Sequence, residues 1–463
     1  MSQPHVVIVV KSKRTLNCTN QVGQAWSGQI RTYMKFSTAI AISCQIRSPF
    51  LSRCGSRYII WANYRLGAMR IRQESPATLK YILSSCVYME LLGLKYNSTL
   101  TMSRIFIIPI RTGATGYIGG DVLFALTQAF RNSNISALVR SESRASQLTD
   151  KFPSVAPVIG DLDSTAKITS EASEADVVLR KTLSLFVVAV GTLTKEKDLA
   201  SSNHLASATA IAQGLTESKR QKPVWIQISG ASLLSGPDIT ANAYGEPRSQ
   251  EFNDLQGISE IRSIITSSPK RAVDNLLLKL SATNPHVRTA IIYGPLIYGR
   301  GRGPVNQRSI QLPDLAKSTI QHGHGLQVGR GLSCWSNVHV SDIAQLVLKL
   351  TQEALSNSQN PSIWNENGIY FAENGKMPFG EISQRVASFA AEQGFIKDST
   401  VKSIDADAAD KLTAHGAVLW GTNVQYTAAR ARELLGWQPQ GPSLEGEIPR
   451  AVREEASQLN SKL

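Results

Sequence analysis

The chain has 463 residues, of which 42% are hydrophobic, and it carries a formal net charge of +14. This length suits one large α/β domain or two smaller ones. Residues 1–101 hold 13 Lys and Arg against only Glu74 and Glu90, a net charge of +11, whereas residues 102–463 hold 36 basic and 33 acidic residues, a net charge of +3. The second part is nearly neutral, so composition argues against nucleic acid as a partner. No apolar run is long enough to span a membrane, and we expect no membrane partner.

Residues 1–101 form a basic, acid-poor, Ser-rich extension with little apolar periodicity. Three interpretations compete: a mitochondrial transit segment, a small extra domain, and sequence that is not natural coding sequence, with Met102 as the true start. We favour the last.

The cysteines are divided unevenly between residues 1–101 and the rest of the chain. None forms a C-x-x-C or other metal spacing, so we expect neither a disulfide framework nor a metal site. They are Cys18, Cys44, Cys54, Cys86 and Cys334. A cytoplasmic protein is expected, or a mitochondrial one if the extension is a transit segment.

An apolar strand beginning at Arg104 leads into three glycines spaced G-x-x-G-x-x-G and then into an amphipathic helix that should end near residue 131. Gly113 permits a tight turn, Gly116 permits close approach of a pyrophosphate, and Gly119 lets the helix lie close to the strand. The free N–H groups and dipole of the helix N-terminus favour an anion. The stretch therefore predicts a dinucleotide-binding site.

Two stretches look like insertions into this pattern. Residues 108–111 separate the first strand from its glycine turn, and Pro109 would remove a hydrogen-bond donor from a central strand. Residues 180–200 stand between a strand at 175–179 and a helix that should begin near residue 201, where a compact βα connection has about two to six residues. Retained intron sequence and a genuine surface loop are the two alternatives.

The end of the second strand, residues 135–139, indicates which dinucleotide is bound. An acidic residue there favours NAD, whereas an arginine can pair with the 2′-phosphate of NADP. This chain has Arg140 and Arg144 and no acid, so we prefer NADP(H) over NAD(H); solvated surface arginines are the alternative. After the third strand, residues 156–159, Asp161 can bind the adenine amino group while Leu162 packs on the ring.

The remaining elements alternate between apolar strands and amphipathic helices, which predicts a doubly wound parallel α/β sheet, a Rossmann fold. We expect strands at 223–228 and 287–292 and helices near 202–217 and 270–282. Leu205 should lie on the apolar face of the first of these helices. Residues 102–295 would form the NAD(P)-binding domain. Residues 296–463 would form a smaller substrate lobe, with helices at 313–321, 341–354, 379–393 and 428–435 and a loop at 304–313 covering the substrate.

Four phrases in this order, the glycine triplet, Gly160-Asp161-Leu162, Ser229-Gly-Ala-Ser232 and Tyr293-Gly294-Pro295, resemble the extended short-chain dehydrogenase/reductases. The resemblance covers about residues 102–463. Within that family, the chain is most similar to the atypical NAD-dependent epimerase/dehydratase-like and NmrA-like branch. It implies a nicotinamide cofactor and a small aldehyde, ketone or alcohol as substrate. The cofactor contacts that it implies are Gly113, Ala114, Thr115, Gly116, Tyr117, Ile118, Gly119, Arg140, Asp161, Leu162, Lys270, Tyr293, Gly294 and Pro295.

The family's catalytic Y-x-x-x-K motif is absent from this sequence. In that motif the lysine lowers the pKa of the tyrosine hydroxyl, so that the hydroxyl can exchange a proton with the substrate oxygen. Here Lys270 stands in the lysine position, but Thr266 stands where the tyrosine should be, before Pro269, and it need not be helical. Ser229 and Ser232 are the candidate hydroxyls.

Other side chains could substitute for the missing tyrosine. Tyr244 follows strand five, although a loop aromatic covering the core is its simpler interpretation. Tyr298 and His339 could line the substrate side, but a buried structural histidine is favoured over an acid–base one. Asp274 is interpreted as a helix residue that holds a nearby loop.

Three functions follow from these observations. The first is an NADP(H)-dependent oxidoreductase that passes hydride to or from a small carbonyl or alcohol. The second is a non-catalytic NADP(H)-binding redox sensor, motivated by the missing tyrosine. The third is a nucleotide-sugar epimerase or dehydratase, which needs the tyrosine more than a reductase does.

Overall fold

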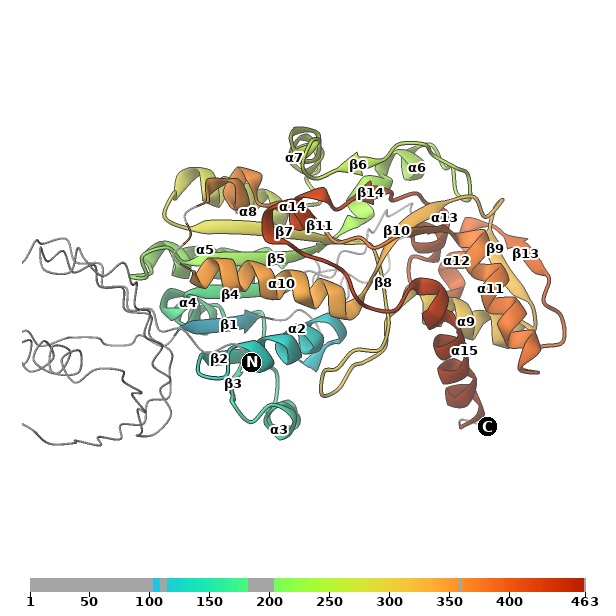
Figure 1. Cartoon of the computed structure of the whole chain (residues 1–463), viewed down its shortest axis with the longest axis horizontal. Coiled ribbons are helices and arrows are strands. Elements are labelled where there is room, and N and C mark those ends of the chain that lie inside the picture. Colours follow the sequence, from blue (N-terminus) through green and yellow to red (C-terminus); the bar gives the residue numbers. More distant parts are fainter. Residues whose placement is uncertain (1–102, 109–114, 182–203, 357, 359, 462–463) are drawn as a thin grey trace, which may run out of the picture. The chain divides into compact units, whose positions relative to one another are not determined.

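The computed structural model describes residues 103–108, 115–181, 204–356, 358 and 360–461. Its centre is a seven-stranded parallel sheet in the order β11-β7-β5-β4-β1-β2-β3 (Figure 1). In chain order the strands are β1 (Arg104–Ile108), β2 (Asn134–Val139), β3 (Val155–Ile159), β4 (Val177–Lys181), β5 (Val224–Gly230), β7 (Arg288–Gly294) and β11 (Ile369–Phe371). Because the strand order reverses beside β1, this is the doubly wound Rossmann arrangement predicted from the sequence.

The central strands are apolar on both faces because helices cover both faces. Ile105 of β1 lies opposite Ile135 of β2 and Val177 of β4, and all three side chains are buried. β1 ends at Ile108, which was expected to begin an insertion but pairs with Arg180 of β4. Residues 109–111 lie outside the described residues.

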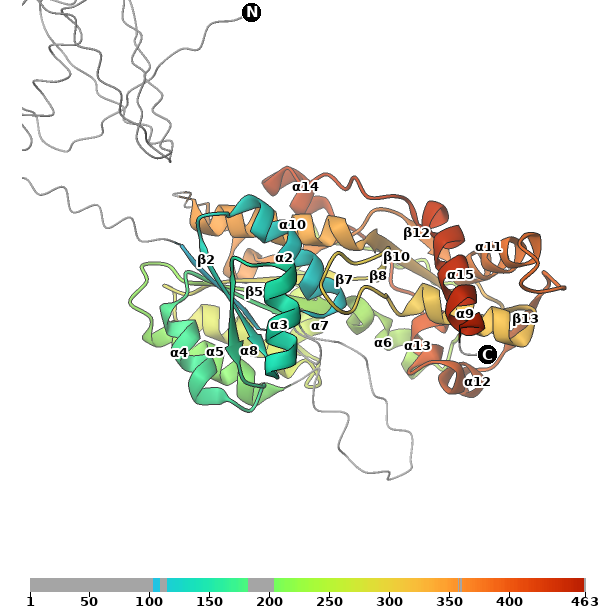
Figure 2. The ribbon, with the colours of Figure 1, turned by 90° about the horizontal axis from the view of Figure 1, so that it is seen from below.

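Helices pack on the two faces in separate groups (Figures 1 and 2). On one face α2 (Tyr117–Ala129) packs against α10 (Val340–Leu355). On the other, α5 (Leu205–Glu217) packs between α4 (Thr165–Glu174) and α8 (Ala272–Thr283). The helix α3 (Glu142–Lys151) packs against β2 and β3, where its N-cap Ser141 accepts a hydrogen bond from the Arg144 amide.

Most of the remaining elements form the C-terminal lobe, beyond the carboxyl ends of β5 and β7 (Figure 1). The helices α9 (Gln311–His322), α11 (Phe379–Glu392) and α15 (Leu444–Asn460) pack together beside the strands β9 (Gly325–Val328) and β13 (Val401–Ile404). A three-stranded sheet joins β8 (Leu296–Tyr298), β10 (Cys334–His339) and β12 (Lys376–Pro378). Shorter elements are η2 (Ala231–Ser235), α6 (Gly236–Thr240), β6 (Phe252–Asn253), α7 (Ile258–Thr266), η3 (Pro361–Ile363), η4 (Asn365–Asn367), α12 (Ala406–Leu412), α13 (Gly416–Gly421), β14 (Tyr426–Thr427) and α14 (Ala429–Leu435).

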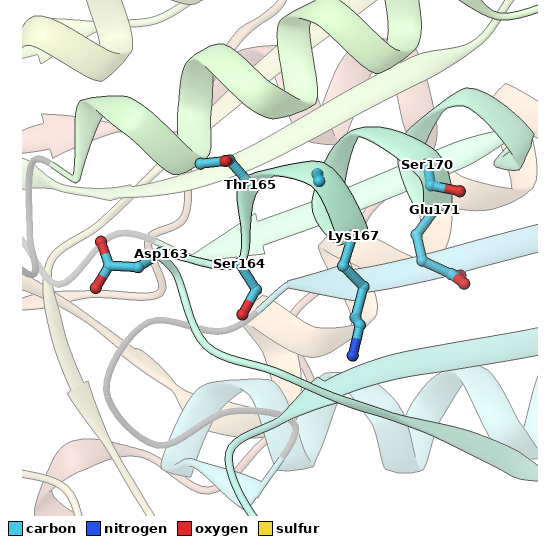
Figure 3. A pocket seen from close by; sticks show the side chains of 7 residues that line it. Asp163, Ser164, Thr165, Lys167, Ser170 and Glu171 are labelled. Carbon is cyan, nitrogen blue, oxygen red and sulfur yellow. The ribbon is translucent and has the colours of Figure 1, made fainter.

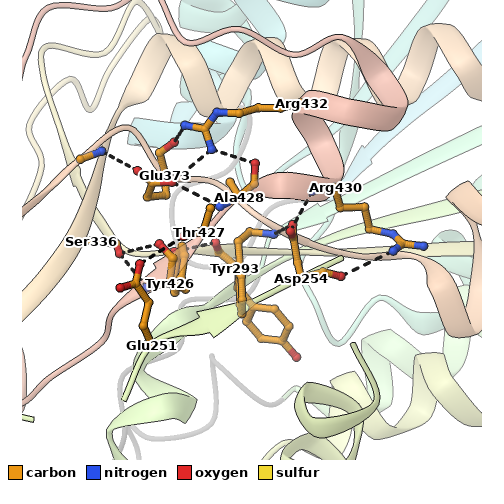
Figure 4. A network of polar contacts seen from close by, with 12 residues as sticks. Glu251, Asp254, Tyr293, Ser336, Glu373, Tyr426, Thr427, Ala428, Arg430 and Arg432 are labelled. Carbon is orange, nitrogen blue, oxygen red and sulfur yellow. Dashed lines mark hydrogen bonds and ion pairs between the residues drawn. The ribbon is translucent and has the colours of Figure 1, made fainter. Parts of the chain in front are cut away.

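A polar network fastens this part of the chain to the edge of the central sheet (Figure 4). The buried carboxylate of Asp254 accepts hydrogen bonds from the backbone N–H of Phe371 in β11 and of Arg430 in α14, both at 2.8 Å. The Tyr426 hydroxyl donates to the carbonyl oxygen of Tyr293 at 3.1 Å. The buried Asp254 carboxylate and the buried Tyr426 hydroxyl are thereby paired, which avoids the cost of leaving them unsatisfied.

The structure differs from the sequence prediction at several boundaries. The strand β11 completes the central sheet although residues 296–463 were assigned to the substrate lobe. Arg180 and Lys181, expected to begin an insertion, belong to β4; residues 182–200 lie outside the described residues, as do residues 1–101. Leu205, expected on the apolar face of α5, is 47% exposed because it opens the helix. None of the helices that the structure describes has the length and apolarity needed to cross a membrane.

Candidate functional site

The described part of the glycine turn lies where the sequence predicts it. Thr115 is buried, Gly116 is the N-cap of α2, and the Gly120 amide donates to the Gly116 carbonyl at 2.7 Å. Tyr117 and Ile118 open the helix with buried side chains, followed by Gly119. Gly113 and Ala114 lie outside the described residues, so their contacts with a cofactor stay predictions.

The loop after β8 lies directly against the first turns of α2. The Tyr117 hydroxyl donates to the Gly299 carbonyl at 2.9 Å, and the Asn306 amide donates to the Thr115 carbonyl at 3.0 Å. The buried Asp121 carboxylate accepts three hydrogen bonds from Arg302, from its backbone N, Nε and Nη2. Part of the stretch expected to be an open loop at 304–313 is helical, because α9 begins at Gln311. The loop therefore holds the helix that carries the glycine motif.

The residues expected at the adenine end lie at the carboxyl ends of β2 and β3. Arg140 directly follows β2 and is exposed, while Arg144 donates to the Gln147 side chain at 3.2 Å. The exposed Asp161 carboxylate accepts hydrogen bonds from the Ser164 hydroxyl and from two backbone N–H groups, and these lower its pKa. Leu162 is half-buried against the core. Both charged groups are therefore on the surface, where a dinucleotide could reach them.

A surface depression lies next to Asp161, along the first turns of α4 (Figure 3). The Lys167 ammonium donates a hydrogen bond to the Ile159 carbonyl at the end of β3. The depression is lined by residues 163–167 together with Ser170 and Glu171. Its walls come from one end of a single helix and the two residues before it, so it forms an open shelf rather than an enclosed binding site.

A buried polar cluster joins the carboxyl ends of β5 and β7 to the start of α8. The Asp274 carboxylate accepts hydrogen bonds from the Ser229 hydroxyl at 2.9 Å and from the Tyr293 hydroxyl at 3.0 Å. The Arg271 guanidinium donates to Ser229 at 3.4 Å and to Ser232 at 3.3 Å. All five side chains are buried. We call these residues the Arg271–Asp274 cluster.

Burial dominates the electrostatics of this cluster. It raises the pKa of the Asp274 carboxyl, against the opposing effects of Arg271 and of the two hydroxyl donors. It also lowers the pKa of Arg271 and raises the pKa of Tyr293 well above its usual range. A neighbouring arginine, Arg180 of β4, is equally buried, and burial lowers its pKa to about 10. Such perturbed groups at the carboxyl edge of a parallel sheet are typical of functional sites.

The structure separates the predicted proton-transfer residues. Ser229 and Ser232 come together through Arg271, but Lys270 is exposed in the turn before α8. Thr266, whose helical conformation the following Pro269 left open, is the last residue of α7, and its hydroxyl donates to the Ser263 carbonyl. Tyr244 is half-buried in the loop after α6, packed against the core beside Gly421.

Sequence reasoning missed Arg271 and misjudged Asp274. Asp274 was interpreted as tying down a loop, but it is the centre of the cluster because it faces β5 and β7 from the first turn of α8. One signal was available: Asp274 stands three residues after Arg271 and three residues before the apolar, buried Leu277, a spacing that places neighbouring side chains on one side of a helix. A charged pair on an apolar face indicates a buried polar site.

Tyr298 and His339 are held by contacts within the lobe. The Tyr298 hydroxyl donates to the Pro442 carbonyl at 2.9 Å. The His339 Nδ1 accepts a hydrogen bond from the Ser341 amide and so caps α10, while burial lowers the pKa of its imidazole. This arrangement agrees with the structural interpretation of His339. Among the described residues, no three His, Cys, Asp or Glu side chains gather as a metal site requires.

Comparison with known proteins gives a relative in sequence and many in structure. The chain is 34% identical to the oxidase ucsJ of Acremonium sp over 358 residues, which cover 75% of this chain and 97% of the relative. No family model matches the chain.

Solved structures show the same fold at low identity. The PbgP3 protein of Burkholderia pseudomallei is 14% identical, with a TM-score of 0.53, and the match covers 77% of this chain and 98% of that one. The UDP-glucuronic acid 4-epimerase of Bacillus cereus, solved with UDP-glucuronic acid and NAD, is 13% identical, with a TM-score of 0.51 over 77% of this chain and 99% of that one. The relative in sequence, the glycine motif and the strand order together lead to one conclusion. The chain belongs to the extended short-chain dehydrogenase/reductases, the NAD-dependent epimerase/dehydratase-like proteins with a Rossmann fold.

Proposed function

We propose that the protein is a nicotinamide dinucleotide-dependent oxidoreductase that prefers NADP(H) and acts on a small aldehyde, ketone or alcohol. The observation that carries this proposal is the Arg271–Asp274 cluster. It brings the serine hydroxyls at the end of β5 together with buried charges at the carboxyl edge of the sheet. Ligands of open α/β sheets bind at that edge.

The described residues fit a dinucleotide. The helix α2 begins at Tyr117 after the N-cap Gly116, with no side-chain cap on its first N–H groups, which suits a pyrophosphate. Asp161 is charged and exposed for the adenine amino group, and Arg140 is exposed for a 2′-phosphate. The cofactor would supply or accept the hydride, and the protein orients the reacting carbon and gives its oxygen a polar contact.

A redox sensor is the second candidate, favoured by one observation. Thr266, in the register of the missing tyrosine, is exposed and hydrogen-bonded within its own helix, where it cannot exchange a proton with a buried substrate. A nucleotide-sugar epimerase or dehydratase is the third candidate and is weakened by the same observation. A polyanionic partner is not part of the proposal, because residues 102–463 carry a net charge of only +3.

The first test is a titration of the full chain with NADPH and, separately, with NADH, followed by tryptophan fluorescence. The buried Trp225 of β5 lies four residues before Ser229 and can report on the site. Tight NADPH binding with weaker NADH binding, followed by NADPH oxidation with benzaldehyde or cyclohexanone, supports the oxidoreductase. Binding without turnover on a wide carbonyl and alcohol panel favours the sensor. Binding of neither dinucleotide refutes the proposed function.

A further inference from the structure

The loop after β8 reaches the helix that carries the glycine motif. Residues 299–306, which we call the strap, come from the C-terminal part of the chain but lie against residues 115–121 at the start of α2. Tyr117 and its partner Gly299, for example, are 182 residues apart in the sequence. The strap therefore joins the C-terminal part of the chain to the end of the helix where a pyrophosphate is expected.

Backbone hydrogen bonds fix the direction of the peptide groups at the start of α2. The Thr115 carbonyl accepts a hydrogen bond from the Asn306 amide of the strap at 3.0 Å. Because a peptide group is planar and trans, this bond also makes the Gly116 N–H point away from the strap. The Gly116 carbonyl accepts the Gly120 amide at 2.7 Å, so the Tyr117 N–H points out of the helix N-terminus for the same reason. Such N–H groups are the ones that bind a phosphate.

Side chains complete the attachment of the strap to the helix. The buried Tyr117 hydroxyl donates to the Gly299 carbonyl at 2.9 Å. The buried Asp121 carboxylate accepts hydrogen bonds from the backbone N, Nε and Nη2 of Arg302. The pair of Asp121 and Arg302 should contribute most to the attachment, because hydrogen bonds between ionised groups are stronger than those between neutral ones.

We propose that the strap is part of the dinucleotide site and that Arg302 is a positioning residue of this site. Through Asp121 it keeps the strap on α2, and the strap keeps the first N–H groups of the helix aimed at the pyrophosphate. Arg302 acts through Asp121 and not by touching the cofactor. The proposal rests on the proposed function, which places the pyrophosphate at this end of α2. Coupling between binding events is reciprocal, so a bound dinucleotide should in turn hold the strap in place.

The test measures the binding of two fragments of NADPH to the full chain by isothermal titration calorimetry. ADP-ribose carries the pyrophosphate, whereas adenosine 2′-monophosphate carries only the adenosine and the 2′-phosphate expected at the ends of β2 and β3. The variants are Arg302→Met, Arg302→Lys, Asp121→Asn and the Arg302→Met/Asp121→Asn double variant. Arg262→Met is the matched control, because Arg262 also pairs with a carboxylate and its side chain is 31% exposed, against 36% for Arg302.

We expect Arg302→Met and Asp121→Asn each to weaken ADP-ribose binding about tenfold, which lies within the usual range of coupling between sites. The double variant should bind ADP-ribose no more weakly than either single variant, because the two residues act as one pair. Affinity for adenosine 2′-monophosphate should change less than about twofold, as for sites that share no partners. Arg302→Lys should recover part of the ADP-ribose affinity, since lysine keeps the charge but not the forked geometry. Arg262→Met should bind both fragments like the unchanged protein.

A second measurement tests the coupling in the opposite direction, on the unchanged protein. The strap carries the exposed Arg300, after which trypsin can cut once the backbone opens locally. Saturating ADP-ribose should slow the appearance of the fragment that begins at Gly301, because it holds the strap on the helix. Adenosine 2′-monophosphate should leave the rate of this cleavage unchanged.

Three results would overturn the proposal. They are an unchanged ADP-ribose affinity in Arg302→Met, an equal loss of affinity for both fragments, and cleavage after Arg300 that ADP-ribose does not slow. An equal loss would mean that Arg302 only supports the fold. If Arg302→Met does not fold, Arg302→Lys and the trypsin measurement decide.

Failure of the proposed function gives a different result. An unchanged protein that binds neither NADPH, NADH nor ADP-ribose refutes the proposed function itself. A protein that binds ADP-ribose but not adenosine 2′-monophosphate lacks only the preference for NADP(H). The ADP-ribose affinity of Arg302→Met is then judged against that of Arg262→Met.

Discussion

Replacing Asp121 by asparagine should loosen the loop that holds the glycine helix. The Asp121 side chain is fully buried, and its two oxygens accept three hydrogen bonds from Arg302. An asparagine can keep the two bonds to Oδ1, at 2.9 Å each, but it loses the 2.6 Å bond between Oδ2 and Nη2 together with the negative charge. It also turns an amide N–H₂ toward the guanidinium, so that two donors face each other.

The cost follows from these contacts. A hydrogen bond to a charged group contributes about 1.5–3 kcal/mol. The Arg302 side chain is 36% exposed, so water can replace part of the lost bond. Arg302 also keeps its contact with the Phe124 ring, whose centroid lies 4.3 Å from the guanidinium carbon. We therefore expect Asp121→Asn to lower the free energy of unfolding by about 2.5 kcal/mol, below the ~3–5 kcal/mol typical of breaking a fully buried pair.

The assay is urea unfolding of the full chain, followed by tryptophan fluorescence. With a slope of about 3 kcal/mol/M, the midpoint should fall by roughly 0.8 M. Asp407→Asn, the same chemical change at an exposed position in α12, is the control and should change stability by less than about 0.5 kcal/mol. In a double-mutant cycle with Arg302→Met, the two substitutions should couple by at least about 1 kcal/mol. Additive effects, or a loss no larger than that of the control, would refute the reasoning.

Three further predictions follow from single contacts. Acid should destabilise the protein below the ordinary histidine pKa. Burial lowers the pKa of His339, so the folded state favours the neutral ring. The stability that this provides near pH 7 is lost as the pH falls and Nδ1, which accepts the Ser341 N–H, is protonated. His339→Asn, which can still cap α10, should remove this pH-dependent component, so the free energy of unfolding should change less between urea titrations at pH 7 and pH 5 than in the unchanged protein. Arg140→Ala should weaken NADPH binding about tenfold and leave NADH binding unchanged in the fluorescence titration. Arg131→Ala, which removes another exposed arginine, should affect the binding of neither dinucleotide. An equal loss of affinity for both dinucleotides would exclude a contact with the 2′-phosphate. Gly303→Ala should cost about 1–3 kcal/mol, because its Cβ would lie 2.8 Å from the Gly120 Cα, whereas Gly236→Ala, with nothing within 4 Å, should be neutral or stabilising in the same urea assay.

The sequence alone was sufficient for six of the seven strands of the central sheet. The run Ile105–Ile108 is apolar at every position, and a strand of that kind is stable only when helices cover both faces. Ile135–Val139 is apolar except at Ser136, and the structure pairs it with β1 in parallel register. Because local composition decides whether such a run can be a buried strand, the βα order could be predicted without tertiary information.

Short elements and segment ends were less predictable. The strand β11 has three residues, Ile369–Phe371, too few to show a period, and it exists because Asp254 and β7 bind its backbone. Leu205 fits the apolar spacing of α5, but it stands at the first position of the helix and remains exposed. For β11 the deciding contacts come from residues far away in the sequence, whereas for Leu205 the deciding factor is where the helix begins.

The candidate site divides in the same way. Sequence indicated the glycine turn and the hydroxyls of Ser229 and Ser232, because they directly follow recognisable strands. It could not distinguish Lys270 from Arg271, since adjacent residues point about 100° apart on a helix and the choice depends on where α8 begins. Only the packing of α8 against β5 and β7 decides that Arg271 and Asp274 face inward, because a buried guanidinium needs the hydrogen-bond partners that those two strand ends provide.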